Sequence, residues 1–180
     1  MGVTKTKLNK AKKKWWMLYT NRRASIEDST VQWVHGTRIG IAESKDGVQW
    51  EYVDTANINY RPDLGYTHWA PDVIEHNGIY HMYLTYVPGT FNNWNHPRVI
   101  VHLTSKDLRN WNYQSIVNPV KNKVIDASVY KINDTTFRMW YNNEKDGKSI
   151  WYADRKDLNL TLAPPDPETQ SFAIDNTRTD

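Results

Sequence analysis

The sequence predicts an all-β fold that forms part of a β-propeller, and three observations lead to this class. An aromatic strand recurs three times, at residues 16–21, 81–86 and 138–143. Each copy is followed by a polar turn with an aspartate, at Asp46, Asp107 and Asp157, so that the turns lie 61 and 50 residues apart. No segment has the apolar period of a helix. Repeats of this length, built from short alternating strands, are typical of propeller blades.

The first unit is expected at residues 15–53. Its strands are predicted at 15–21, 37–42 and 50–53, with the turn Asp46-Gly47 between the last two. Residues 57–67 contain Pro and Gly without alternation and are predicted to form a loop.

The second unit, residues 69–117, is the most complete, and the third begins at residue 124. Asn77-Gly78 separates two alternating apolar strands, which is a strong signal for a tight β-hairpin. The strands of the second unit are predicted at 72–76, 80–86, 99–104 and 111–116. Those of the third unit are predicted at 124–132, 136–142 and 149–153.

The predicted domain organisation is a basic disordered lead (1–14), a partial propeller (15–162) and a disordered tail (163–180). The propeller part amounts to about two and a half to three blades of antiparallel sheet. Propellers typically close with about four to eight blades, so that an open stack leaves an apolar face exposed at each end. Self-association through these open faces is therefore a possible mode of assembly.

Composition and charge exclude several function classes. The formal net charge is +3, but six lysines and no acidic residue fall within residues 1–14, so that the rest of the chain carries −3. Because the rest of the chain is mildly acidic, no nucleic-acid partner is predicted. The alternative is a protein that binds DNA through the lysines of residues 1–14, and such binding would depend strongly on salt. The sequence contains no apolar stretch of the kind that spans a membrane or forms a secretory signal. No membrane partner is therefore predicted, and a cytoplasmic location is the default expectation. No cofactor motif and no paired histidine spacing is present, so no cofactor and no metal are predicted.

Several segments resemble glycoside hydrolase family 43-type enzymes. The resemblance rests on residues 69–78 (WAPDVIEHNG) and 124–130 (VIDASVY), each followed by an aromatic strand, and on shorter matches at 19–23, 34–37 and 94–98. It implies a partial five-bladed propeller and a glycosidase that hydrolyses O-glycosidic bonds in arabinose- or xylose-type glycans. The alternative is a non-catalytic carbohydrate-binding or scaffold fragment of such a propeller.

The resemblance also implies three catalytic carboxylates, of which one matches a residue here. Asp126 occupies the position of the third-blade aspartate, which tunes and positions the acid. The base would precede Trp15, where residues 1–14 hold no Asp or Glu, and Glu168 does not match the context of the acid. Since an inverting glycosidase needs an acid and a base about 6.5–9.5 Å apart, the resemblance implies a chain truncated at both ends and catalytically incomplete.

The remaining candidate site residues come from strand starts and loops. When the second and third units are aligned, residues 70, 72, 126 and 128 fall on alternate positions of their strands, so their side chains are expected to face the same side. Asp72 is therefore a second catalytic candidate. Asp72 could equally organise a turn, and each of the others could be structural or solvated. The candidates for substrate binding are Arg22, His35, Trp69, His96, Arg98 and Asn143.

Overall fold

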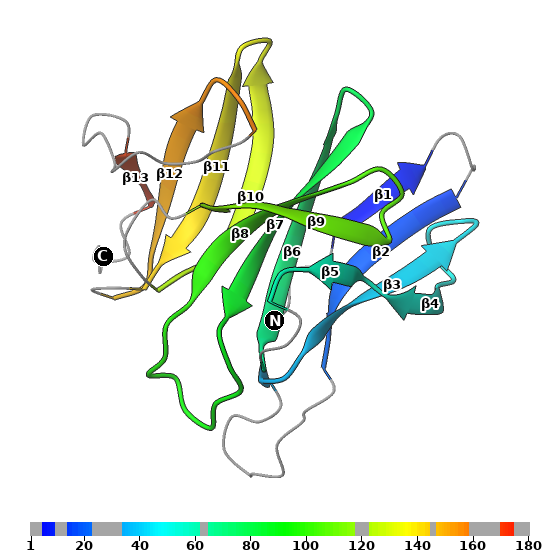
Figure 1. Cartoon of the computed structure of the whole chain (residues 1–180). Helices are drawn as coiled ribbons and strands as arrows, with labels where there is room; N and C mark the ends of the chain where they lie inside the picture. Colours follow the sequence, from blue (N-terminus) through cyan, green and yellow to red (C-terminus); the bar gives the residue numbers. More distant parts are fainter. Residues whose placement is uncertain are drawn as a thin grey trace.

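The structure, a computed structural model, confirms the all-β class and the partial propeller. It describes residues 5–9, 14–22, 34–61, 65–117, 123–144, 147–158 and 170–174, with the backbone alone at 5–9 and 170–174. Its regular elements are strands in three sheets, which fan out side by side in Figure 1. Among the described residues there is no helix of the length and apolarity needed to cross a bilayer.

Each sheet is a meander of antiparallel strands, as expected for a propeller blade. The first sheet has the order β1 (Lys5–Asn9), β2 (Lys14–Asn21), β3 (Arg38–Ser44) and β4 (Glu51–Thr55). The second comprises β6 (Thr67–His76), β7 (Ile79–Val87), β8 (Val99–Ser105) and β9 (Asn110–Val117), with the short β5 (Asn57–Asn59) parallel to β9. The third has β10 (Val124–Asn133), β11 (Thr136–Asn143), β12 (Ser149–Arg155) and β13 (Gln170–Ile174).

Three strands lie where the sequence predicted none. β1 falls within the expected disordered lead, β13 within the expected disordered tail and β5 within the expected loop. β1 pairs with the edge of β2, β13 with that of β12 and β5 with that of β9. An edge strand offers a row of unpaired backbone groups, and a segment without an alternating pattern of its own can pair with it. The rest of residues 1–13 and 159–180 lies outside the described residues.

A repeated β-bulge shapes the start of the inner strands β6 and β10. Pairing with the neighbouring strand shifts register between Trp69 and Asp72 in β6, and between Ile125 and Ser128 in β10. At these bulges Ala70 (φ 45°) and Asp126 (φ 55°) adopt the left-handed conformation. In both cases the N–H of the left-handed residue donates to a threonine hydroxyl of the preceding sheet.

The threonine contacts join successive sheets in the same way. The Ala70 N–H donates to Thr20 Oγ1 at 2.9 Å, and the Asp126 N–H donates to Thr85 Oγ1 at 3.0 Å. Thr20 lies on β2 and Thr85 at the equivalent position of β7. The two junctions therefore repeat one another, which is the behaviour expected of consecutive propeller blades.

Two apolar cores fill the spaces between the sheets. The core between the first and second sheets includes Trp16, Leu18, Ile41, Met82, Leu84, Leu103 and Trp111. The core between the second and third sheets includes Tyr83, Ile100, Val129, Phe137, Met139, Tyr141 and Leu158. Tyr83 also donates its hydroxyl to the Leu158 carbonyl at 2.6 Å, which satisfies a polar group within that core.

The recurring turn aspartate has a structural function. The Arg109 and Asn110 N–H groups both donate to Asp107 Oδ1 at 2.8 Å, and Trp111 Nε1 donates to the Leu108 carbonyl at 3.1 Å. Burial alone would raise the pKa of Asp107, but the hydrogen bonds from Asn110 and Arg109 outweigh it and hold that pKa below its usual range. The same bonds recur at residues 44–50. The motif thus closes the turn between the two outer strands.

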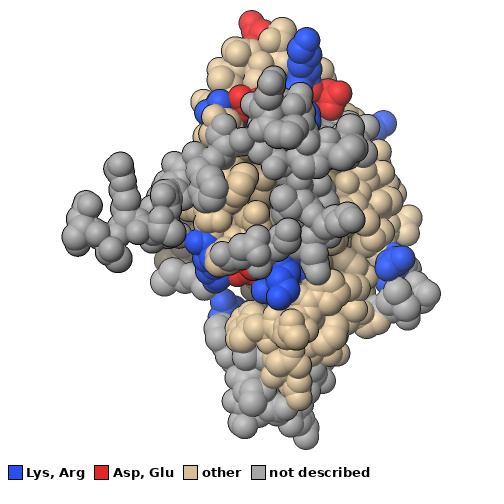
Figure 2. Space-filling model, turned by 90° about the vertical axis from the view of Figure 1, so that its left-hand side faces the viewer, with Lys and Arg blue, Asp and Glu red and all other residues tan. Residues whose placement is uncertain are grey.

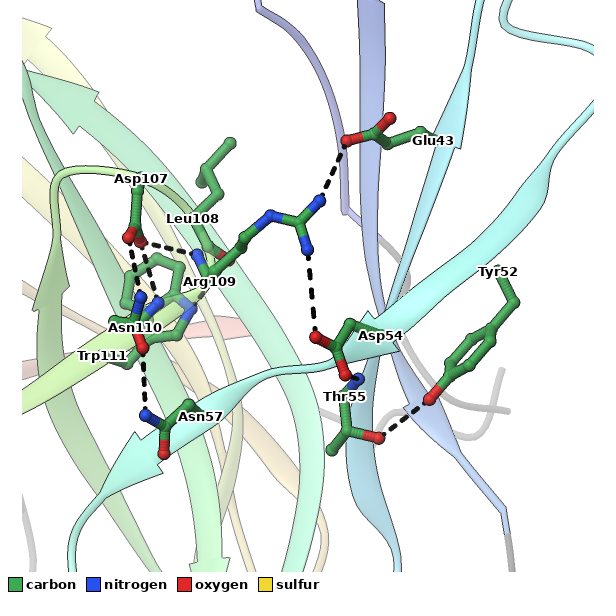
Figure 3. A network of polar contacts seen from close by, with 10 residues as sticks. All are labelled: Glu43, Tyr52, Asp54, Thr55, Asn57, Asp107, Leu108, Arg109, Asn110 and Trp111. Carbon is green, nitrogen blue, oxygen red and sulfur yellow. Dashed lines mark hydrogen bonds and ion pairs between the residues drawn. The ribbon is translucent and has the colours of Figure 1, made fainter.

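Arg109 also links the first sheet to the second, as Figure 3 shows. Its guanidinium lies 3.4 Å from Glu43 and 3.9 Å from Asp54, and it stands over the Trp16 ring at 5.2 Å from the centroid. Because Arg109 is partly exposed, each ion pair contributes little, and the contact with Trp16 adds a cation–π attraction.

Candidate functional site

A pocket of about 430 Å³ opens where the inner strands β6 and β10 begin. Four of the predicted site residues line it: Arg22 at the end of β2, Trp69 on β6, Arg98 before β8 and Asp126 on β10. These residues come from all three sheets. The pocket is therefore a product of the assembled propeller rather than of one blade.

Asp126 is held in the pocket by its bulge. The left-handed backbone at Asp126 is a conformation that Asp tolerates better than most residues do. Asn142 Nδ2 donates to Asp126 Oδ2 at 3.2 Å. Burial raises the pKa of the Asp126 carboxyl, and the charge of Glu144 adds to this, whereas the Asn142 hydrogen bond and Lys148 act in the opposite direction. A carboxyl with a raised pKa in a pocket is a feature of functional sites.

Glu144 is a second pocket carboxylate that the sequence did not single out as a site residue. It accepts from Arg98 Nε at 2.7 Å and lies 3.3 Å from Lys148 Nζ. The side chains of Arg98 and Glu144 are 7% and 10% exposed, which makes this a buried ion pair. Thr20, Trp94 and Lys148 also line the pocket without having been predicted as site residues. Thr20 lies near the end of β2, Trp94 in the loop between β7 and β8 and Lys148 directly before β12, so their convergence depends on how the sheets pack.

Replacing Glu144 by glutamine is expected to lower the pKa of Asp126, because it removes a like charge beside the carboxyl. Lys148→Met should shift this pKa in the opposite direction, because it removes a nearby cation. The carbon-13 chemical shift of the Asp126 carboxyl, followed against pH, measures both. A pKa that both substitutions leave unchanged would show that these charges do not act on Asp126.

Two tryptophans form an aromatic wall of the pocket. Trp69 donates its indole N–H to the Val34 carbonyl, and its ring lies 6.1 Å from that of Trp94. Trp94 is 49% exposed. Partly exposed indole rings present a flat apolar face, which suits the faces of sugar rings.

His35 and His96 lie behind this wall and do not line the pocket. His35 is fully buried, with its ring 5.5 Å from Trp69, 5.8 Å from Trp94 and 4.9 Å from His96. His96 is 2% exposed and stacks on Phe91. The structure therefore places both histidines as packing partners of the tryptophans.

Acid is expected to destabilise the fold through its buried histidines. Burial, with the charges of His96 and Arg98, lowers the pKa of His35 to about 4, and burial together with Arg38 lowers that of His68 to about 3. The unfolded chain therefore binds more protons below about pH 6.5, so stability is complete above that pH and falls toward pH 4 and then pH 3. Urea unfolding at about pH 7.5 and about pH 5 measures the loss, which His68→Phe should reduce. Equal urea midpoints at the two pH values would contradict this assignment.

Asp72 is buried and points away from the pocket. It has 0% exposure, and its Oδ2 accepts from the Val129 N–H at 2.8 Å, across the junction between the second and third sheets. Ser128, at the equivalent position of β10, is exposed. Residues 70 and 126 both line the pocket. The expectation that residues 72 and 128 face the same side as residues 70 and 126 is wrong, because the bulges interrupt the alternation of both strands.

Asn143 does not line the pocket either. It is 8% exposed at the end of β11, whereas its neighbour Asn142 reaches Asp126. Successive residues of a strand face opposite sides, so only one of the two can contact the site. Among the described residues, no group of three or more His, Asp or Glu side chains is arranged to hold a metal ion.

Comparisons with known proteins give one family match. The sequence model of glycosyl hydrolases family 43 matches residues 25–174. No curated protein sequence matches the chain.

Solved structures show the same fold at low sequence identity. A family 117 glycoside hydrolase from the marine bacterium Zobellia galactanivorans has a TM-score of 0.68 and 16% identity, over 94% of this chain and 58% of its own. A thermostable family-43 glycoside hydrolase has a TM-score of 0.67 and 18% identity, over 96% and 52%. The α-L-arabinanase of Cellvibrio cellulosa, solved with arabinohexaose, has a TM-score of 0.59 and 19% identity, over 96% and 52%. The chain thus spans little more than half the length of these proteins.

Proposed function

The chain belongs to glycosyl hydrolase family 43, and we propose that it binds arabinose- or xylose-type glycans and supplies part of the catalytic machinery that hydrolyses their O-glycosidic bonds. The observation that carries the proposal is the pocket that Asp126 and two tryptophans line together. A sugar would lie in this pocket, with its ring on the indoles and its hydroxyls toward the carboxyl. The family membership supports the same substrate class.

Asp126 is the proposed catalytic group of this chain. Water would attack the anomeric carbon while a separate acid protonates the leaving oxygen, and Asp126 would orient that acid and raise its pKa. Glu144 is not assigned as acid or base, because Arg98 and Lys148 engage both of its oxygens. Asp72 is assigned a structural contact instead of a catalytic one, because its carboxylate is directed into the sheet junction.

Binding of arabinohexaose and of xylohexaose, measured by calorimetry, tests the proposed function. We expect one of them to bind, and Trp69→Ala to weaken that binding by about tenfold, as for the loss of one well-packed aromatic contact. Wild-type protein that binds neither sugar would refute the proposal. We expect the 180-residue chain alone to hydrolyse nitrophenyl arabinofuranoside and xyloside negligibly; turnover that Asp126→Asn abolishes would show instead that the chain is catalytically sufficient.

A second candidate function is a non-catalytic carbohydrate-binding scaffold that associates through its open faces. The observation in its favour is the outer side of β10, where Tyr130 is 64% and Ile132 43% exposed. Light scattering after size-exclusion chromatography would show a dimer that Ile132→Lys dissociates. Ile116→Lys on β9 is the matched control, since Ile116 is 41% exposed in the second sheet. A monomer at every concentration would exclude the scaffold.

The proposal includes neither a nucleic-acid nor a membrane partner. On the face of the molecule shown in Figure 2, the described Lys and Arg side chains lie in small groups with Asp and Glu side chains near them. Such mixed charge is unfavourable for a phosphate backbone. DNA binding that weakens steeply with salt and disappears on deletion of residues 1–14 would contradict this part of the proposal.

A further inference from the structure

Arg98 joins two parts of the pocket lining. Its Nε donates to Glu144 Oε2 at 2.7 Å on the carboxylate side, and its Nη1 donates to the Trp94 carbonyl at 3.0 Å on the aromatic side. The Arg98 side chain is 7% exposed. Both bonds are therefore shielded from water, where hydrogen bonds of a charged group are strongest.

The backbone of Arg98 holds the same region together. Its carbonyl accepts from the Lys123 N–H at 3.1 Å and from the Val124 N–H at 3.4 Å, and the Glu144 N–H donates to the Lys123 carbonyl at 2.8 Å. These bonds connect the start of β8 with the start of β10 and the end of β11. Arg98 is thus anchored by its main chain, and its guanidinium bridges from that fixed point.

Trp94 is the part of the pocket that depends most on this bridge. It lies in the loop between β7 and β8 and is half exposed, so its ring is packed on one side only, against Trp69 and His35. Its backbone carbonyl is held by Arg98. Through Arg98, the loop is therefore connected by charged, directional hydrogen bonds to Glu144.

We propose that Arg98 is a positioning residue that fixes the distance between Trp94 and the Asp126–Glu144 wall across the bound sugar. The inference rests on the proposed glycan-binding function. The planar guanidinium donates in two directions at once, whereas a lysine at this position could pair with Glu144 but could not also reach the Trp94 carbonyl in a fixed geometry. Lysine should therefore restore the ion pair and the stability without restoring the position of the loop.

The test measures the environment of the Trp94 ring and the affinity for sugar in parallel. The full chain is labelled with 5-fluorotryptophan, and the fluorine-19 signal of Trp94 is assigned through Trp94→Phe. We expect Arg98→Met and Arg98→Lys both to move or broaden this signal and to weaken binding of arabinohexaose or xylohexaose by at least about tenfold, which corresponds to the loss of one charged hydrogen bond. Arg98→Lys should retain more of the wild-type melting temperature than Arg98→Met does.

Arg109→Met is the matched control, because Arg109 also bridges two sheets by ion pairs but lies outside the pocket. It should lower stability slightly and leave the Trp94 signal and sugar affinity unchanged. If Arg98→Met does not fold, Arg98→Lys and Glu144→Gln provide the same comparison.

Two outcomes would overturn the positioning role. One is a folded Arg98 variant with the wild-type Trp94 signal, and the other is an Arg98→Lys protein in which affinity recovers together with stability. If the wild-type chain binds neither sugar but substitution of Arg98 still changes the Trp94 signal, the glycan-binding function is refuted and the positioning of Trp94 by Arg98 is upheld.

Discussion

Replacing Asp72 by alanine is expected to lower the free energy of unfolding by about 2–4 kcal/mol, because it leaves a buried N–H without its charged acceptor. Asp72 is fully buried, and its carboxylate accepts from the Val129 N–H between the second and third sheets. Water cannot readily replace that acceptor inside the junction. Urea unfolding at neutral pH measures the effect, and midpoint and slope together should report a two-state loss of stability.

Ser128→Ala is the matched control for Asp72→Ala. Ser128 occupies the equivalent position of β10 but is exposed, so the change should stay within about 0.5 kcal/mol. Because Asp72 and Ser128 have equivalent strand positions, the difference between the two losses of stability reports the contact at the sheet junction. A loss below about 1 kcal/mol for Asp72→Ala would mean that the Val129 contact contributes little to the fold.

Replacing Trp111 by alanine should cost about 3–5 kcal/mol, the range found for large aromatic side chains removed from a core. Trp111 is 1% exposed within the core between the first and second sheets, and its indole N–H donates to the Leu108 carbonyl. Truncation would both open a cavity and remove this bond. In a chain whose total stability is of the usual size, about 5–15 kcal/mol, the loss could unfold the protein near body temperature.

Trp50→Ala provides the comparison for Trp111→Ala. Trp50 has the same place in the first copy of the turn motif and the same bond, to the Gly47 carbonyl at 3.1 Å, but it is only half buried. Thermal and urea unfolding should show a clearly smaller loss for Trp50. Equal losses would indicate that the turn, and not the core, accounts for the effect at both positions.

Much of the fold could be predicted because its signals are local. Asn77 (φ 52°) and Gly78 (φ 77°) form the tight turn that their residue types favour, since two left-handed positions in succession suit Asn and Gly. The Ser-Lys-Asp turns likewise carry their own hydrogen bonds, within a few residues of the aspartate. The aromatic alternation then locates the strands between these turns.

The candidate site was predictable only in part. Asp126, Arg22, Trp69 and Arg98 were chosen from motifs and do line the pocket, whereas Asp72, His35, His96 and Asn143 do not. Strand parity failed at Asp72 because one extra residue in the bulge reverses the side on which it points. Glu144 was not among the chosen candidates, and its ion pair with Arg98 could not be predicted, because the two residues lie 46 positions apart in the sequence.

The sequence alone was enough for the β class, the repeat and the hairpins, since each depends on backbone preferences within about ten residues. Only the tertiary structure decided which polar groups meet: the burial of Asp72 against Val129 and the pairing of Arg98 with Glu144. The physical reason is that these contacts form between separate sheets, whose relative placement is set by cores and bulges and not by any local pattern.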